Sequence, residues 1–77
     1  MNKYFYTFGT ADYFPHYGGW VEVMADDWGW ADTKFTDFYP LHNDMINCAF
    51  RYTESEFQAT GMHKTGNIGN YCHKRIA

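Results

Sequence analysis

Charged side chains are scarce in this sequence, cysteines and prolines number two each, and a long apolar run is missing. Without about 20 consecutive apolar residues, no segment is expected to cross a bilayer as a helix. The opening Met1-Asn2-Lys3 leads into a polar and aromatic segment, so no secretory signal peptide is predicted and a cytoplasmic protein is expected. In a reducing cytoplasm, Cys48 and Cys72 are most simply two thiols, with a disulfide as the less favoured alternative.

The balance of charges argues against a protein that binds nucleic acid without sequence preference. Six Lys and Arg residues stand against nine Asp and Glu residues, and the net charge is −3. Non-specific affinity for nucleic acid comes mainly from Lys and Arg that neutralise phosphates. The acidic excess is also too small for a nucleic-acid mimic built from rows of carboxylates.

Aromatic side chains are abundant, at 22% of the 77 residues. Each buried aromatic side chain removes roughly 150–250 Å² from water, so the set can anchor a small core without disulfides or metal. Few charged residues remain to cover the outside. We therefore expect part of the aromatic surface to stay exposed or to be covered by a partner.

The apolar pattern predicts a single α+β domain over residues 1–77. We expect a small, mainly antiparallel sheet with one main helix and one short helix on one face, in the order β-β-α-β-α-β. The expected strands are residues 3–8, 20–25, 47–52 and 71–76, with a loop at residues 10–19.

Local signals mark the ends of both expected helices. Asp26 and Asp27 supply an N-cap for the main helix, and Pro40 ends it. Its apolar stripe is predicted to comprise Trp28, Ala31, Phe35 and Phe38. Thr53 and Glu56 have the spacing of a capping box that opens the short helix, which Gly61 ends.

Side-chain alternation sorts the first two strands into two faces. Val21, Val23 and Ala25 suit a core beneath the helices. The opposite face is expected to be bulky and uncovered, with Tyr4, Tyr6, Phe8, Trp20 and Met24 as its members. Because Tyr, Trp and Met are enriched at interfaces, this face is a candidate contact surface for a partner protein or a homodimer. In the alternative, the C-terminal segment or the loop of residues 11–19 covers it.

No motif in the sequence indicates a catalytic or metal site. The histidines and cysteines lack the closely spaced pairs of structural zinc sites; they are His16, His42, His63, His73, Cys48 and Cys72. The paired carboxylates are explained by helix starts. Nucleophile elbows and phosphate-binding loops of known type are missing. We therefore expect a protein that is not an enzyme and that needs no metal or cofactor.

The segment Thr65-Gly-Asn-Ile-Gly-Asn70 is rich in glycine and has basic residues near it. Exposed backbone N–H groups of such loops can hold an anion when cations lie close by. Lys64, Lys74 and Arg75 are the candidate cations. With the aromatic face to stack a base, this segment makes nucleotide capture an alternative function.

Five different short motifs are spread along most of the chain: Tyr4-Phe-Tyr-Thr-Phe-Gly9, Phe14-Pro15, Gly18-Gly-Trp-Val-Glu-Val23, Asn47-Cys-Ala-Phe50 and Tyr52-Thr53-Glu54. In this combination the sequence resembles small accessory proteins of bacteriophages and bacterial mobile elements. The resemblance implies a role against host defences, as in anti-CRISPR proteins, and assigns no residue an activity. We expect a protein that binds and inhibits a host protein such as a nuclease complex. A nucleotide-sequestering protein and a structural homodimer are the alternatives.

Overall fold

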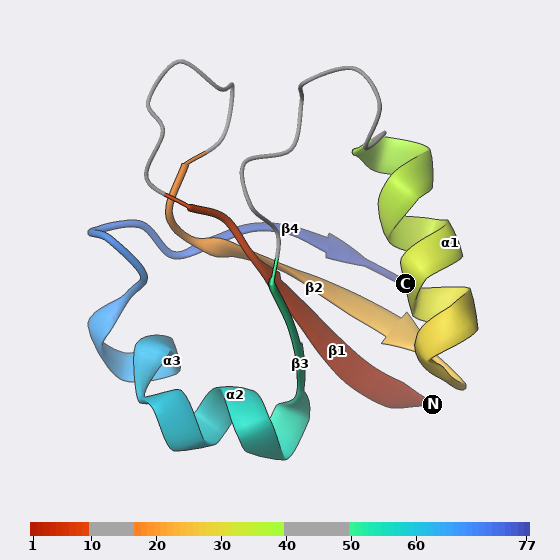
Figure 1. Ribbon diagram of the computed structural model, residues 1–77, viewed down its shortest axis with the longest axis horizontal. Coiled ribbons are helices and arrows are strands. Elements are labelled where there is room, and N and C mark those ends of the chain that lie inside the picture. The colour runs from red at the N-terminus through yellow and green to blue at the C-terminus, as the bar shows by residue number, and fades with distance from the viewer. Residues whose placement is uncertain (10–16, 40–49) are drawn as a thin grey trace.

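The computed structural model describes residues 1–9, 17–39 and 50–77. Within these ranges, four strands form one mixed sheet in the order β3-β1-β2-β4 (Figure 1). The strands are β1 (Asn2–Thr7), β2 (Trp20–Ala25), β3 (Phe50–Thr53) and β4 (Cys72–Ile76), and the helices are α1 (Trp28–Phe38), α2 (Glu54–Thr60) and α3 (Met62–Thr65). The predicted α+β class is confirmed. No helix in the described part of the chain has the length and apolar character to cross a membrane.

The predicted helix caps are confirmed. The Asp27 carboxylate accepts a hydrogen bond from the backbone N–H of Trp30 at 2.8 Å and caps α1. At α2, the Thr53 hydroxyl accepts from the N–H of Glu56, and the Glu56 carboxylate accepts from the N–H of Thr53. α2 ends at Gly61, whose φ of 77° costs glycine little. The short α3 that follows Gly61 was not predicted.

The strand directions agree with the predicted sheet except at its last strand. β1 pairs antiparallel with both β2 and β3, whereas β4 pairs parallel with β2.

Asn67 holds the chain in place just before β4. Its side-chain amide donates to the carbonyl oxygens of Phe8 at 3.0 Å and Gly19 at 2.8 Å. β4 is thereby guided to the free edge of β2.

The two expected helices lie on opposite faces of the sheet, and the prediction of one shared face is wrong. α1 covers one core, while α2 and α3 cover a second core centred on Phe5, Trp20 and Phe57 (Figure 1). The capping box at Thr53 starts α2 directly at the end of β3. From there Phe57 stacks on Phe5, with ring centroids 4.3 Å apart, on the face away from α1.

The strand register divides the predicted aromatic face between these two cores. Tyr4 pairs with Val23 and Thr7 with Trp20, so even-numbered residues of β1 share a face with odd-numbered residues of β2. Side-chain alternation alone does not reveal this, because a shift of one residue exchanges the two faces. The prediction that Tyr4 and Trp20 lie on the same face is therefore wrong.

The five side chains predicted to form an uncovered face do not do so. The exposed fractions are 6% for Tyr4, 2% for Tyr6, 2% for Phe8 and 6% for Trp20. The first three pack beneath α1, and Trp20 packs against Phe57 on the other face. Met24 is half-buried on the side of Trp20. Tyr4, Tyr6, Phe8 and Trp20 thus belong to the two cores and not to an open face.

Candidate interaction surface

Exposed aromatic and acidic side chains lie along α1 and on the two residues just before it. We term this set the α1 outer face; its members are Asp26, Asp27, Trp30, Thr33, Asp37 and Phe38. The exposed fractions of Trp30 and Phe38 are 60% and 51%. Large aromatic side chains with this exposure, set among carboxylates, mark a surface that a partner can cover.

Phe38 was predicted to belong to the buried stripe of the helix, and this is wrong. Ala31 and Phe35 are buried as expected, but the next buried residue is Tyr39, with 6% of its surface exposed. Tyr39 lies four residues beyond Phe35 and stacks on its ring, with centroids 5.1 Å apart. Phe38 is therefore turned away from the core by its position in the helix.

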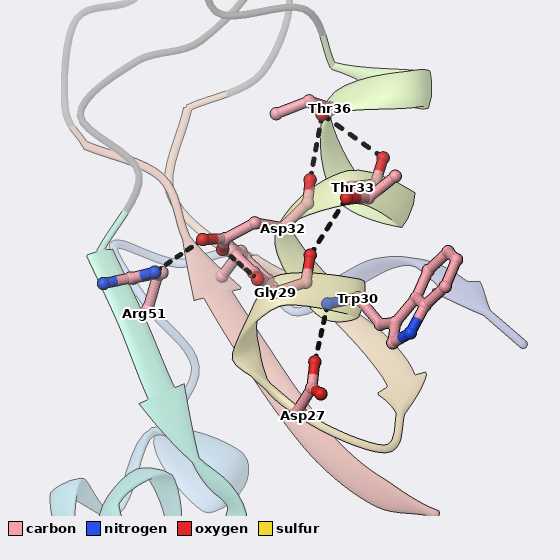
Figure 2. Close-up of polar contacts among 8 residues, drawn as sticks. Asp27, Gly29, Trp30, Asp32, Thr33, Thr36 and Arg51 are labelled. Atoms are coloured by element: carbon pink, nitrogen blue, oxygen red, sulfur yellow. Dashed lines mark hydrogen bonds and ion pairs between the residues drawn. The ribbon is translucent and has the colours of Figure 1, made fainter.

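The Asp32 carboxylate attaches α1 to two strands. It accepts hydrogen bonds from the Tyr6 hydroxyl and from Nη1 of Arg51, each at 2.6 Å. Figure 2 shows the contact of Asp32 with Arg51. The Arg51 guanidinium also lies 4.9 Å from the centre of the Trp28 ring. Burial, and then the bond to Asp32, raise the pKa of Tyr6 far above its usual range, so this hydroxyl stays a donor. These contacts hold α1 in one orientation on the sheet.

The cations near α1 point toward the sheet and its edge. Lys34, the only cation in the α1 sequence, donates from Nζ to the carbonyl oxygen of Met24 at 2.8 Å. Lys74 on β4 lies 4.6 Å from the centre of the Phe38 ring. Apart from Lys74 beside Phe38, the charged groups of the α1 outer face are the carboxylates of Asp26, Asp27 and Asp37.

Trp30 is the most prominent side chain on the α1 outer face. Figure 2 shows its indole projecting away from the helix axis, on the side opposite Arg51. A shallow hollow of about 310 Å³ adjoins the ring and is lined by Trp30, Asp27, Gly29 and Thr33. The Thr33 hydroxyl donates to the Gly29 carbonyl at 3.0 Å, so it needs no outside partner. The ring thus stands on a capped helix start with open space beside it.

The three cations predicted to bind an anion do not converge. Lys74 lies on the α1 side of the sheet, beside Phe38. Nε of Arg75 lies 3.5 Å from Oε2 of Glu22, on the opposite face. Lys64 is exposed on α3. The structure therefore offers no common site for these side chains.

The glycine-rich segment beside these cations is a tight turn. The N–H groups of Asn67 and Asn70 each donate to the other residue's carbonyl, at 2.8 and 3.1 Å. The N–H of Gly66 donates to the carbonyl of Met62 at 2.7 Å. Because these N–H groups bond within the chain, they do not form an anion cradle.

The described residues contain no group of three or more His, Cys, Asp or Glu side chains placed to hold a metal ion. Cys72 carries a free thiol. A nitrogen of the His73 ring lies 3.0 Å from the carbonyl oxygen of Gly18. His16, His42 and Cys48 lie outside the described residues.

Comparison with protein-family models found no matching family, and searches of curated proteins and of solved structures found no match either. The interpretation of the α1 outer face therefore depends on its geometry and charge.

Proposed function

We propose that this protein works by binding a partner protein through the α1 outer face and has no catalytic role. The observation that carries the proposal is Trp30, an indole with 60% of its surface exposed. Tryptophan is among the residue types most enriched at the energetic centres of interfaces. The cap at Asp27 and the bonds of Asp32 hold the helix beneath it, so little ordering entropy would be lost on binding.

The charges on this face favour a partner with a basic surface. Exposed Asp26, Asp27 and Asp37 accompany Trp30, and Lys34 is directed to the sheet. Complementary charge speeds encounter and selects among partners. Basic surfaces are typical of proteins that handle nucleic acid. With the resemblance to phage accessory proteins, we propose a nuclease complex of a host defence system as the partner, inhibited in the host cytoplasm.

Nucleotide capture has less support from the geometry. The rings expected to stack a base, Tyr4, Tyr6 and Trp20, are each at most 6% exposed. Lys74 and Arg75 extend from opposite faces of the sheet. A planar base and its phosphate would therefore find no shared site among these residues.

The proposal is tested by capturing proteins from a bacterial lysate with two matched variants. Trp30→Ala removes the ring on α1, and Phe50→Ala removes a ring on β3 that is also 60% exposed. Thermal unfolding should show both variants folded, since neither ring is buried. A partner bound through the α1 outer face should lose about tenfold or more in affinity with Trp30→Ala, as hot-spot truncations do, and keep its affinity with Phe50→Ala.

Equal effects of the two variants would contradict the proposal, as would a captured protein that neither variant releases. Sedimentation of the wild-type protein supplies a further check. Self-association that Phe50→Ala abolishes and Trp30→Ala leaves intact would support the structural homodimer instead. Because the proposed face is acidic, affinity for the captured partner should also fall as salt rises.

A further inference from the structure

The start of α1 holds an exposed indole and two carboxylates that no cation of the described residues contacts. The hollow beside Trp30 measures about 310 Å³ and is lined by Asp27, Gly29, Trp30 and Thr33. Within the described residues, neither Asp26 nor Asp27 forms an ion pair. In the same part of the chain, no aromatic ring stacks on the Trp30 indole and no cation lies over it. An exposed indole beside a carboxylate is a favourable setting for an organic cation.

The same helix shows which cation such a pair of groups accepts. The Arg51 guanidinium lies 4.9 Å from the centre of the Trp28 ring and donates to the Asp32 carboxylate at 2.6 Å. One guanidinium thus contacts an indole and a carboxylate of α1 at once, on the side of the helix opposite the Trp30 indole (Figure 2). Asp27 and Trp30 offer the same two groups without a cation from the described residues.

Gly29 keeps the hollow open although the fold does not require a glycine there. Its φ is outside the left-handed region, and a Cβ would meet only Oδ1 of Asp27, at an ordinary contact distance of 3.4 Å. Glycine is among the least favourable residues inside a helix. Because Gly29 lines the hollow, a side chain at this position would take up part of its volume.

The helix dipole opposes a cation at this end of α1, but the carboxylates outweigh it. The N-terminus of a helix carries about half a positive charge. Asp26 and Asp27 together bring two negative charges to the same place, and Asp26 and Asp27 are both exposed. The net charge next to the hollow is therefore negative and attracts a cation of a partner.

We infer that the hollow beside Trp30 receives an arginine side chain of the partner protein. The inference rests on the proposed function, because it names the group that the α1 outer face binds. The guanidinium lies over the indole and pairs with Asp27, which repeats the arrangement of Arg51 on the other side of the helix. Arginine suits this site better than lysine, because a planar, weakly hydrated guanidinium stacks on aromatic rings.

The inference is tested by NMR titration with N-acetylarginine amide, and N-acetylcitrulline amide serves as the uncharged probe of the same shape. The indole N–H of Trp30 reports on the hollow, and that of Trp20, in the core on the other face of the sheet, is the internal reference. The arginine probe should shift the Trp30 signal saturably and bind at least about threefold more tightly than the citrulline probe.

Two matched variants separate the charge of the hollow from the net charge of the protein. Asp27→Asn keeps an N-cap, since asparagine caps helices about as well as aspartate, and should weaken binding of the arginine probe about two- to fivefold. Asp37→Asn removes the same charge about two helical turns beyond Trp30. It should change the affinity by less than about 1.5-fold, because salt screens an exposed charge at that distance.

Gly29→Leu tests the room in the hollow. The leucine side chain should weaken binding of the arginine probe at least about threefold, because it fills space that the guanidinium needs. The melting temperature should not fall, since leucine is more favourable than glycine in a helix. A loss of binding in this variant therefore does not reflect unfolding.

The inference is overturned if the citrulline probe binds as well as the arginine probe. It is equally overturned if Asp27→Asn and Asp37→Asn bind the arginine probe alike, or if Gly29→Leu binds it as the wild type does. The proposed function stands or falls separately, because release of the captured partner by Trp30→Ala does not depend on which group enters the hollow.

Discussion

Replacing Asp32 with alanine tests whether one carboxylate holds α1 on the sheet. In the structure, the Tyr6 hydroxyl and the Arg51 guanidinium each donate to Asp32 at 2.6 Å. The substitution removes the acceptor from both groups. The cost should come mainly from Tyr6, because only 2% of this residue is exposed and water reaches it poorly.

The expected loss of stability is about 2 kcal/mol. A hydrogen bond to a charged acceptor contributes about 1.5–3 kcal/mol. The bond to Arg51 adds only about 0–1 kcal/mol, since the two side chains are 51% and 43% exposed. The substitution also stabilises the helix by about 0.7 kcal/mol, because alanine has a higher helix propensity than aspartate. For a domain of this size the melting temperature should fall by about 8–16 °C.

Urea unfolding of Asp32→Ala, Tyr6→Phe and the double variant measures the coupling directly. The two single changes should be non-additive by about 1–2 kcal/mol, because they remove the same bond. Asp37→Ala on the exposed side of the same helix is the matched control, with an expected effect within about 0.5 kcal/mol. Additive single effects, or an Asp32→Ala variant as stable as the control, would refute this account of α1.

Gly19→Ala should destabilise the protein more than Gly69→Ala. Both glycines have a positive φ, 67° at Gly19 and 77° at Gly69. Of the two, only Gly19 lies so close to a backbone oxygen, that of Tyr71, that an added Cβ would clash with it, at 2.4 Å. Thermal unfolding should show a difference of about 1–3 kcal/mol, and equal losses would contradict the close approach. The raised pKa of Tyr6 means that the folded chain keeps this proton above pH 10 while the unfolded chain releases it, so stability falls as pH rises. In Tyr6→Phe that decline should be shallower by about 1.4 kcal/mol per pH unit, measured by urea unfolding; an unchanged slope would exclude Tyr6 as the source. Hydrogen bonds from Thr53 lower the pKa of Glu56, so stability present above pH 4.5 is lost as pH falls through the lower folded value. Glu56→Gln should show a smaller drop in melting temperature between neutral and acid pH, and a drop as large as that of the wild type would count against the capping box.

The features predicted correctly from the sequence depend on residues close together along the chain. Each helix cap can be recognised from a few neighbouring residues: Asp27 for α1, Thr53 with Glu56 for the start of α2, and Gly61 for its end. Such signals act within one helical turn, so distant parts of the chain do not alter them. The α+β class followed from the same local patterns.

The two faces of the sheet were predicted wrongly because they depend on contacts between distant residues. Tyr4 of β1 pairs with Val23 of β2, and pairing with the residue before or after Val23 would put different rings in the same core. Neither strand contains that information by itself. The placement of Phe57 on Phe5, which brings α2 to the second face, is likewise a contact between segments far apart in sequence.

The α1 outer face was missed for a more local reason. Spacings of three and four residues both fit a helical stripe, and Phe38 was assigned to it in place of Tyr39. The remaining signal was Trp30, an aromatic residue off the stripe and close to carboxylates. A large ring on the polar side of a predicted helix was the indication of a contact surface in this sequence.

Every residue of β1 from Tyr4 to Thr7 is buried, and the strand supplies rings to both cores at once. Neither half of the molecule can therefore melt while the other keeps its packing, and unfolding should be a single all-or-none event. A partner bound to α1 would shift this single unfolding equilibrium. It should therefore slow hydrogen exchange on both sides of the sheet, including the side that it does not touch.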